Sequence, residues 1–69
     1  MHKAPVQSKS IKSIGYDAQT SILEIEFHNG NVYQYFDVPQ AVHVEMMQAA
    51  SLGQFFIAQI KGNYRYAKL

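Results

Sequence analysis

Cysteine is absent from this chain of 69 residues, which excludes disulfides, thiolate nucleophiles and sulfur-ligated metal sites. Long apolar runs are missing as well: the longest stretches have only a few residues, so no segment is expected to span a membrane. The N-terminal residues also lack the apolar run that a secretory signal needs. We therefore expect a soluble, cytoplasmic domain.

The composition is that of a folded domain, with 48% hydrophobic and 16% charged residues. A chain of this length can build only one core and buries only about 60% of its unfolded surface. Residues 1–7 are polar and interrupted by Pro5, so we expect a flexible lead-in there. Residues 8–69 should form the domain.

Charged residues are few, and their placement is uneven. Residues 13–60 hold all five carboxylates and no Lys or Arg. The six cations lie at the two ends of the chain: Lys3, Lys9, Lys12, Lys61, Arg65 and Lys68. If the ends meet, they form one basic face that would attract phosphates or an acidic partner. Otherwise they are solvated chain ends that favour solubility.

Three segments have strand character. Residues 10–16 read as a first strand, with Gly15 suggesting a bulge. Residues 23–27 alternate strictly between apolar and polar, as a strand with one buried face does. Asn29-Gly30 supplies a turn, and residues 32–36 are rich in strand formers, which predicts a β-hairpin.

The register of this hairpin decides where two tyrosines point. A two-residue loop would place Tyr33 and Tyr35 on the polar face of the sheet. A three-residue loop ending at a left-handed Gly30 would pair Tyr33 with Ile25 and turn both tyrosines towards the core. We favour the second register, because the first would place Gln34 in the core.

Helical spacing follows from Pro39 onwards. One apolar stripe joins Val42, Met46, Ala49 and Ala50. Ser51 and Gln54 have the spacing of a capping box, which would end a first helix and begin a second. Gly62 suits the C-terminal cap of this second helix. The tail, residues 63–69, alternates aromatic and basic residues and is either a short strand or an extended strap.

The predicted fold is α+β, in the order β-β-β-α-α: a three-stranded antiparallel sheet with two helices packed on one face. Its expected core is Ile14, Leu23, Ile25, Phe27, Val38, Val42, Met46, Leu52, Phe55, Phe56 and Ile60.

Catalysis finds little support in the sequence. Glu24 and Glu26 would share one face of a strand about 6–7 Å apart, but such a pair is typical of a solvated sheet face. The three histidines, His2, His28 and His43, lack metal-ligand spacing, and the scattered glycines form no phosphate loop. We therefore expect no catalytic residue, metal or cofactor, and no enzyme activity.

Binding has more support, because tyrosines and cations are the residues that stack on and neutralise single-stranded nucleic acid. In this hypothesis Tyr64 and Tyr66 stack on bases. The phosphate contacts come from Lys9, Lys12, Lys61, Arg65 and Lys68. The competing interpretation is that tyrosines in so small a domain serve the core, with only their hydroxyls reaching water.

An ordered set of residues carries a family resemblance. It comprises Ile14-Gly15-Tyr16-Asp17, Leu23-x-Ile25-x-Phe27, Gly30, Tyr33-x-Tyr35, Val38-Pro39, Ala50-Ser51-x-Gly53-x-Phe55-Phe56 and Ile60-Lys61. Over residues 8–66 this pattern resembles the KTSC domain, a module of some bacterial lysyl-tRNA synthetases that also occurs alone. Tyr33 and Tyr35 match its central motif, whereas Ile57 stands where the family commonly has Asn.

The resemblance implies a small α+β domain without assigned catalytic residues, and it adds to the case for RNA. The leading hypothesis is a non-catalytic accessory module that binds RNA, tRNA in particular. The alternative is a protein-interaction module or a homodimer formed through a sheet edge. RNA binding requires the basic ends to converge and affinity to fall with salt, whereas a protein interface requires an exposed apolar patch.

Overall fold

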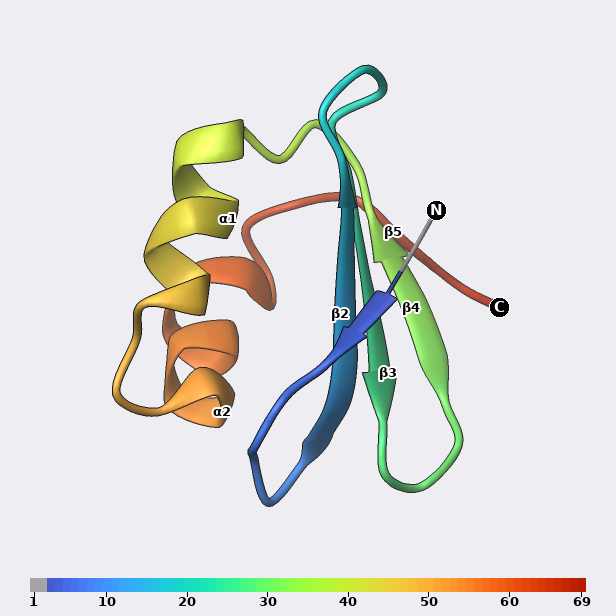
Figure 1. Ribbon diagram of the computed structural model, residues 1–69. Helices are drawn as coiled ribbons and strands as arrows, with labels where there is room; N and C mark the ends of the chain where they lie inside the picture. The colour runs from blue at the N-terminus through green and yellow to red at the C-terminus, as the bar shows by residue number, and fades with distance from the viewer. Residues whose placement is uncertain (1–2) are drawn as a thin grey trace.

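The computed structural model describes residues 3–69 as one antiparallel sheet covered on one face by helices (Figure 1). The strands, in spatial order, are β1 (Lys3–Pro5), β2 (Ile11–Asp17), β3 (Ile22–Phe27), β4 (Val32–Tyr35) and β5 (Tyr66–Lys68). The helical layer consists of α1 (Gln40–Met47), α2 (Leu52–Phe55) and the π-helical turn η1 (Phe56–Ile60). None of the helices in this described part is long and apolar enough to cross a membrane.

The α+β class, the antiparallel sheet and the helices on one face are confirmed, but the prediction of three strands was wrong. β1 lies within residues 1–7, where we expected a flexible lead-in, and β5 lies in the tail. Each has only three residues, too few for a periodic pattern, and each forms by pairing with a longer strand. Pro5 in β1 is tolerated because β1 is an edge strand.

An irregularity in β2 explains why two isoleucines spaced by three both reach the core. The register of β2 against β3 shifts between Ile11 and Ser13, which places the extra residue at Lys12 rather than near Gly15. Ile11 and Ile14 are both buried as a result. Ile11 was missing from the predicted core because its spacing from Ile14 does not fit a regular strand.

The β3–β4 hairpin adopts the favoured register, with Ile25 opposite Tyr33. Gly30 has φ +92°, the left-handed conformation that the three-residue loop requires. The Gly30 N–H donates to the Phe27 carbonyl (3.0 Å), and the Phe27 N–H donates to the Asn31 carbonyl (2.9 Å). Both motif tyrosines therefore face the helical layer.

The core lies between the sheet and the helices. Its buried apolar residues are Ile11, Ile14, Leu23, Ile25, Tyr35, Val38, Met46, Phe56 and Ile60. The other predicted members, Phe27, Val42, Leu52 and Phe55, are half-buried and pack against it. Ala49 and Ala50 do not continue the stripe, because α1 ends at Met47.

The second helical segment, α2 followed by η1, begins after the predicted N-cap Ser51 and ends just before the predicted C-terminal cap Gly62. The Ser51 Oγ accepts a hydrogen bond from the Gln54 N–H (3.3 Å), as an N-cap does. At the other end the Lys61 N–H donates to the Phe56 carbonyl (2.8 Å), which closes the wide π turn. Gly62 follows with φ +83°, and the chain turns back towards the sheet.

Candidate functional site

The sheet order keeps the two basic ends of the chain apart. β1 and β5 are the two edge strands, with three strands between them. At about 4.8 Å per strand, they are roughly 19 Å apart along the sheet. The continuous basic face that converging ends would have made is therefore not formed through the sheet.

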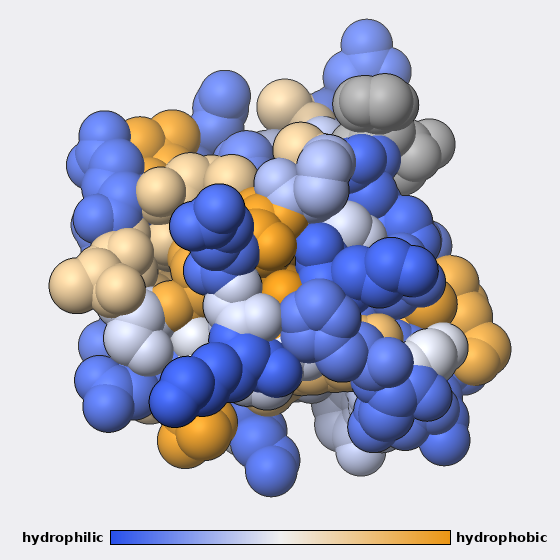
Figure 2. Space-filling model, turned by 60° about the horizontal axis from the view of Figure 1, so that its bottom comes forward, coloured by the Kyte–Doolittle hydropathy of each residue, from blue (hydrophilic) through white to orange (hydrophobic). Residues whose placement is uncertain are grey.

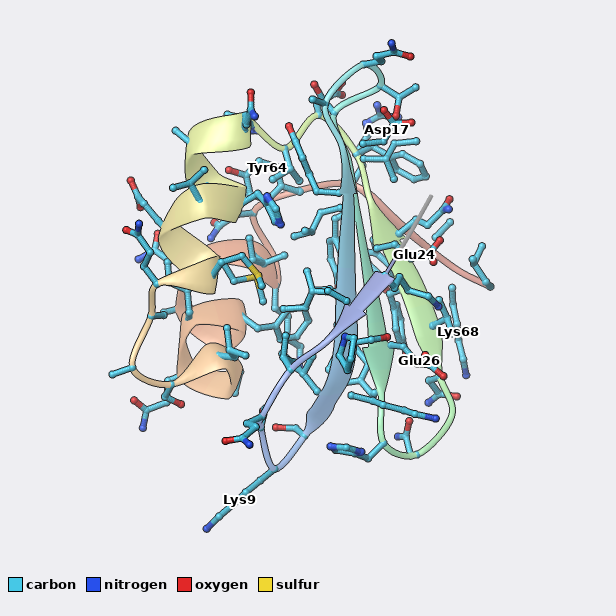
Figure 3. The ribbon with its side chains drawn as sticks, in the orientation of Figure 1. Lys9, Asp17, Glu24, Glu26, Tyr64 and Lys68 are labelled. Carbon is cyan, nitrogen blue, oxygen red and sulfur yellow. The ribbon has the colours of Figure 1, made fainter. Side chains whose placement is uncertain are left out.

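The cations near the N-terminus face carboxylates on the open face, the side of the sheet away from the helices (Figure 3). The Lys3 Nζ lies 3.2 Å from Glu24 Oε2 and 3.6 Å from Glu26 Oε1, and the Lys12 Nζ lies 3.9 Å from Glu26 Oε2. The Ser13 hydroxyl donates to Glu26 (3.0 Å). That hydrogen bond, with the nearby lysines, lowers the pKa of Glu26. Lys12 is thus mostly exposed but lies beside a carboxylate, which offsets part of its attraction for a phosphate.

Of three other residues predicted to bind RNA, Tyr64 and Arg65 line a hollow of about 700 Å³ together with Tyr66, and Lys9 lies apart from them. Tyr64 is half-buried against the core, between helices and sheet. The Arg65 Nη2 lies 2.8 Å from Asp37 Oδ2, with its guanidinium 5.6 Å from the centre of the Phe36 ring. Lys9 is exposed on the loop between β1 and β2.

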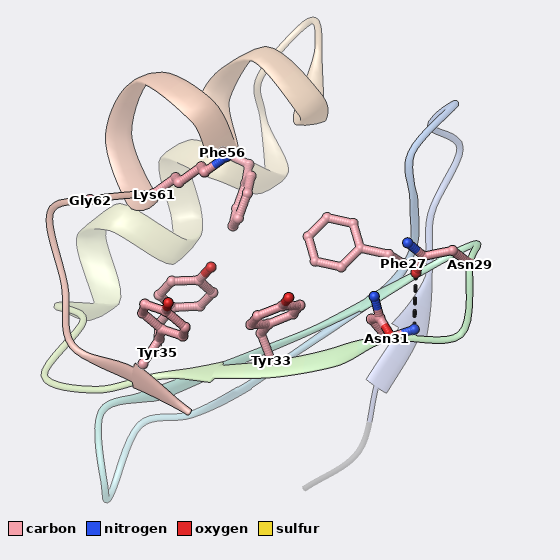
Figure 4. A pocket seen from close by; sticks show the side chains of 9 residues that line it. Phe27, Asn29, Asn31, Tyr33, Tyr35, Phe56, Lys61 and Gly62 are labelled. Carbon is pink, nitrogen blue, oxygen red and sulfur yellow. Dashed lines mark hydrogen bonds between the residues drawn. The ribbon is translucent and has the colours of Figure 1, made fainter. Parts of the chain in front are cut away.

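A pocket of about 330 Å³ lies between the sheet and the end of η1 (Figure 4). We call it the aromatic pocket. Its lining is drawn from β3, the hairpin loop, β4, η1, the turn after η1 and β5: Phe27, Asn29, Asn31, Tyr33, Tyr35, Phe56, Lys61, Gly62 and Tyr66. It brings together residues from three distant parts of the chain.

The five rings of this pocket contact one another. The centroids of Tyr33 and Tyr35 are 6.4 Å apart with nearly parallel planes, and Tyr66 lies 5.8 and 5.7 Å from them. Phe56 meets Tyr35 edge to face at 5.6 Å, and Phe27 meets Tyr33 in the same way at 5.7 Å. Burial, with a smaller effect of Tyr33 and Tyr66, raises the pKa of Tyr35, so its phenol stays neutral.

The polar groups around the rings are amides and cations. Lys61 is exposed at the rim, and Lys68 lies directly opposite Tyr33 in β5, on the same face of the sheet. The Asn29 Oδ1 accepts a hydrogen bond from the Asn31 N–H (3.0 Å), the dashed line in Figure 4. Among the described residues, the lining includes no Asp or Glu.

The aromatic pocket therefore unites only part of the predicted set. Lys61 and Tyr66 line it together with the motif residues Tyr33 and Tyr35, and Lys68 adjoins it. Phe27, Asn29 and Asn31 were not predicted as site residues. The favoured hairpin register could have indicated them, since it places the loop beside both tyrosines.

Comparison with known proteins gives a consistent result. The sequence model described as the KTSC domain matches residues 7–64. An uncharacterised protein of Stutzerimonas stutzeri is 40% identical over 70 residues, covering 100% of this chain and 99% of the relative. The crystal structure of a KTSC domain protein from Yersinia pestis superposes with a TM-score of 0.94 at 43% identity, covering 99% of this chain and 96% of that one.

A second kind of relative is much longer. A lysine–tRNA ligase of Trichormus variabilis is 44% identical over 59 residues, which are 86% of this chain but only 10% of the ligase. A ligase of Nostoc punctiforme matches over the same shares at 42% identity. Sequences similar to this chain thus occur both as a small protein and as a segment of a tRNA ligase.

Proposed function

The chain belongs to the KTSC domain family, and from this premise we propose that it is a non-catalytic accessory module that binds single-stranded RNA in the aromatic pocket. The observation that carries the proposal is the composition of this pocket. Its exposed ring, Tyr66, and the ring of Tyr33 offer stacking surfaces, each worth about 1–3 kcal/mol per base.

The charges around the pocket support the same ligand. Lys61 lies on the rim of the pocket and Lys68 lies opposite Tyr33 in the neighbouring strand, and we assign to them the phosphates on either side of a stacked base. The described lining contains no carboxylate that would repel an approaching anion. This arrangement replaces the predicted convergence of the two chain ends with a smaller site whose cations, Lys61 and Lys68, come from the C-terminal end alone.

Two further points bear on the kind of RNA and on our proposal that the module is non-catalytic. Relatives of this chain are segments of lysine–tRNA ligases, which makes tRNA a natural probe by association. The titratable groups of the pocket are phenols and one lysine, with no nucleophile and base in contact. Within residues 3–69 no group of three His, Cys, Asp or Glu could hold a metal ion.

The test is fluorescence anisotropy of a labelled single-stranded RNA and of tRNA, at about 50 and 200 mM salt. Tyr66→Ala should weaken binding about 5- to 150-fold through lost stacking. Lys61→Glu should also weaken it and reduce its salt dependence. Lys9→Glu is the matched control, because it makes the same charge change on an exposed loop outside the aromatic pocket.

Two results would contradict the proposal. One is the absence of binding at the lower salt concentration, where electrostatic attraction is strongest. The other is equal weakening by Lys61→Glu and Lys9→Glu, which would assign binding to the overall charge rather than to the aromatic pocket.

A protein partner is the second candidate, favoured by the outer side of the helical layer. Residues 38–60 carry a single charge, Glu45, and they include the exposed apolar side chains Val44, Met47 and Ile57, of which Ile57 is 66% exposed. Figure 2 shows apolar residues gathered over this side. Pairing through a sheet edge has less support, because β1 and β5 are three residues long. Salt-insensitive self-association in light scattering, lost in Ile57→Asn, would favour this candidate.

A further inference from the structure

We propose that an RNA strand bound in the aromatic pocket continues past Tyr66 into a second hollow, where Arg65 binds a further phosphate. This inference rests on the RNA-binding function proposed above and extends its site. The second hollow has a volume of about 700 Å³ and is more open than the aromatic pocket. We call it the outer hollow. It is lined by the residue after β4, the segment after η1 and the start of β5: Phe36, Gly62, Asn63, Tyr64, Arg65 and Tyr66.

The two hollows meet at Tyr66 and Gly62, which line both of them. The ring of Tyr66 is 60% exposed and lies 5.8 Å from the ring of Tyr33 in the aromatic pocket. Gly62 has no side chain, and a Cβ atom at this position would meet no atom beyond the neighbouring residues within 4 Å. No side chain of Gly62 therefore separates the two hollows, and a strand stacked on Tyr66 can extend from one into the other.

Arg65 is the only charged residue in the described lining of the outer hollow. Its guanidinium carbon lies 5.6 Å from the centre of the Phe36 ring, a cation–π contact. The Phe36 N–H donates to the Arg65 carbonyl (2.9 Å), which fixes the main chain of Arg65 against the end of β4. Both contacts hold the guanidinium beside the outer hollow in the absence of a ligand, which lowers the ordering cost of binding.

The ion pair with Asp37 leaves part of the guanidinium available. The Arg65 Nη2 donates to Asp37 Oδ2 (2.8 Å), and within residues 3–69 the Nε and Nη1 groups have no hydrogen-bond partner. The side chains of Arg65 and Asp37 are 78% and 76% exposed, so water screens their attraction. A phosphate can therefore use the remaining donors or displace the carboxylate, because Arg binds phosphate oxygens through paired N–H groups.

The other polar side chains of the outer hollow serve the fold. The Asn63 Nδ2 donates to the Gln59 carbonyl (3.0 Å) at the end of η1, and Tyr64 packs half-buried against the core. Phe36 is half-buried, and Arg65 lies over its ring. The outer hollow therefore offers a contact to the RNA backbone rather than a second stacking site for a base.

The first experiment measures fluorescence anisotropy of a labelled uridine hexamer with the full chain at several salt concentrations. Arg65→Ala should weaken binding at least about 3-fold, because a charge-assisted hydrogen bond to phosphate is lost and the exposed pair with Asp37 offsets little of it. The slope of log affinity against log salt should fall by about 0.7, the value for one phosphate of a single strand. Lys9→Ala is the matched control, because it removes one exposed cation outside both hollows.

A second pair of variants tests the role of the carboxylate. Asp37→Asn should strengthen hexamer binding by up to about 5-fold, because the phosphate no longer competes with Asp37 for the guanidinium. Asparagine tolerates the φ of +58° that Asp37 adopts, so the fold should be retained. Glu45→Gln makes the same charge change on α1, outside both hollows, and should leave the affinity nearly unchanged.

The length of the RNA separates the outer hollow from the aromatic pocket. An unlabelled uridine dinucleotide, used as a competitor of the hexamer, has a single phosphate, which our proposal assigns to Lys61 at the pocket rim. Arg65→Ala should therefore weaken the hexamer more than the dinucleotide. Equal weakening of both ligands, or equal weakening of the hexamer by Arg65→Ala and Lys9→Ala, would overturn the inference and leave the aromatic pocket as the site. Failure of the hexamer to bind the unmodified chain would overturn the proposed function itself.

Discussion

Replacing Tyr35 by alanine should strongly destabilise the domain, whereas the same change at Tyr66 should alter its stability little. Tyr35 is 4% exposed and Tyr66 is 60% exposed, although both line the aromatic pocket. Removing a buried aromatic ring costs about 3–5 kcal/mol. A domain of this length has a total stability of only about 3–10 kcal/mol. Tyr35→Ala should therefore lower the melting temperature by at least about 12 °C.

Circular dichroism on heating and in urea measures this difference. Tyr66→Ala removes a mostly exposed ring, so its cost should be less than about 1 kcal/mol, with a shift of a few degrees. Tyr35→Phe is the matched control at the buried position, because it keeps the ring and removes only the hydroxyl. It should melt close to the unmodified chain.

A different result would refute the reasoning about the two rings. If Tyr35→Ala melts within a few degrees of the unmodified chain, the ring of Tyr35 does not hold β4 against the helical layer. If Tyr66→Ala unfolds the domain, Tyr66 is a core residue and its effect on RNA affinity would carry no information about stacking.

Two further predictions concern acid and the hairpin loop. Burial lowers the pKa of His43 from 6.5, so the folded state disfavours its charged form, and stability should fall as pH drops below 6.5. The pKa of Glu26 is lowered from 4.5, so its contribution to folding stability is complete above pH 4.5 and is lost at lower pH. The measurement is the urea midpoint as a function of pH. The decline below pH 6.5 should be missing in His43→Gln, and the decline below pH 4.5 should be missing in Glu26→Gln. Gly30→Ala should cost about 1–2 kcal/mol in urea unfolding, because φ +92° strains any residue with a Cβ, and Gly30→Asn should cost less.

The parts of the fold that local patterns determine could be predicted from the sequence. Alternation in residues 23–27 and the left-handed Gly30 are sufficient for β3, for its hairpin with β4 and for the register. A shift of one residue would have turned Gln34 into the core, so burial itself selects the observed pairing. The same physical reason explains why the core was largely predictable.

The edge strands could not be predicted in this way. β1 and β5 have three residues each and exist because β2 and β4 offer unpaired backbone groups to them. Their positions depend on the turns that precede or follow them, and no periodicity records this. The placement of the basic ends at opposite edges therefore required the three-dimensional structure.

The aromatic pocket depends both on local sequence patterns and on the pairing of an edge strand, which explains why only some of its residues were predicted. Tyr33 and Tyr35 belong to the pocket through the hairpin register, a local property that the sequence indicates. Tyr66 and Lys68 reach it only because β5 pairs with β4, with Tyr66 opposite Tyr35. Had the tail remained an extended strap away from the sheet, the same tyrosines would form a plain core face. The pairing of β5 is thus what converts a packed aromatic face into a pocket with a cation at its rim.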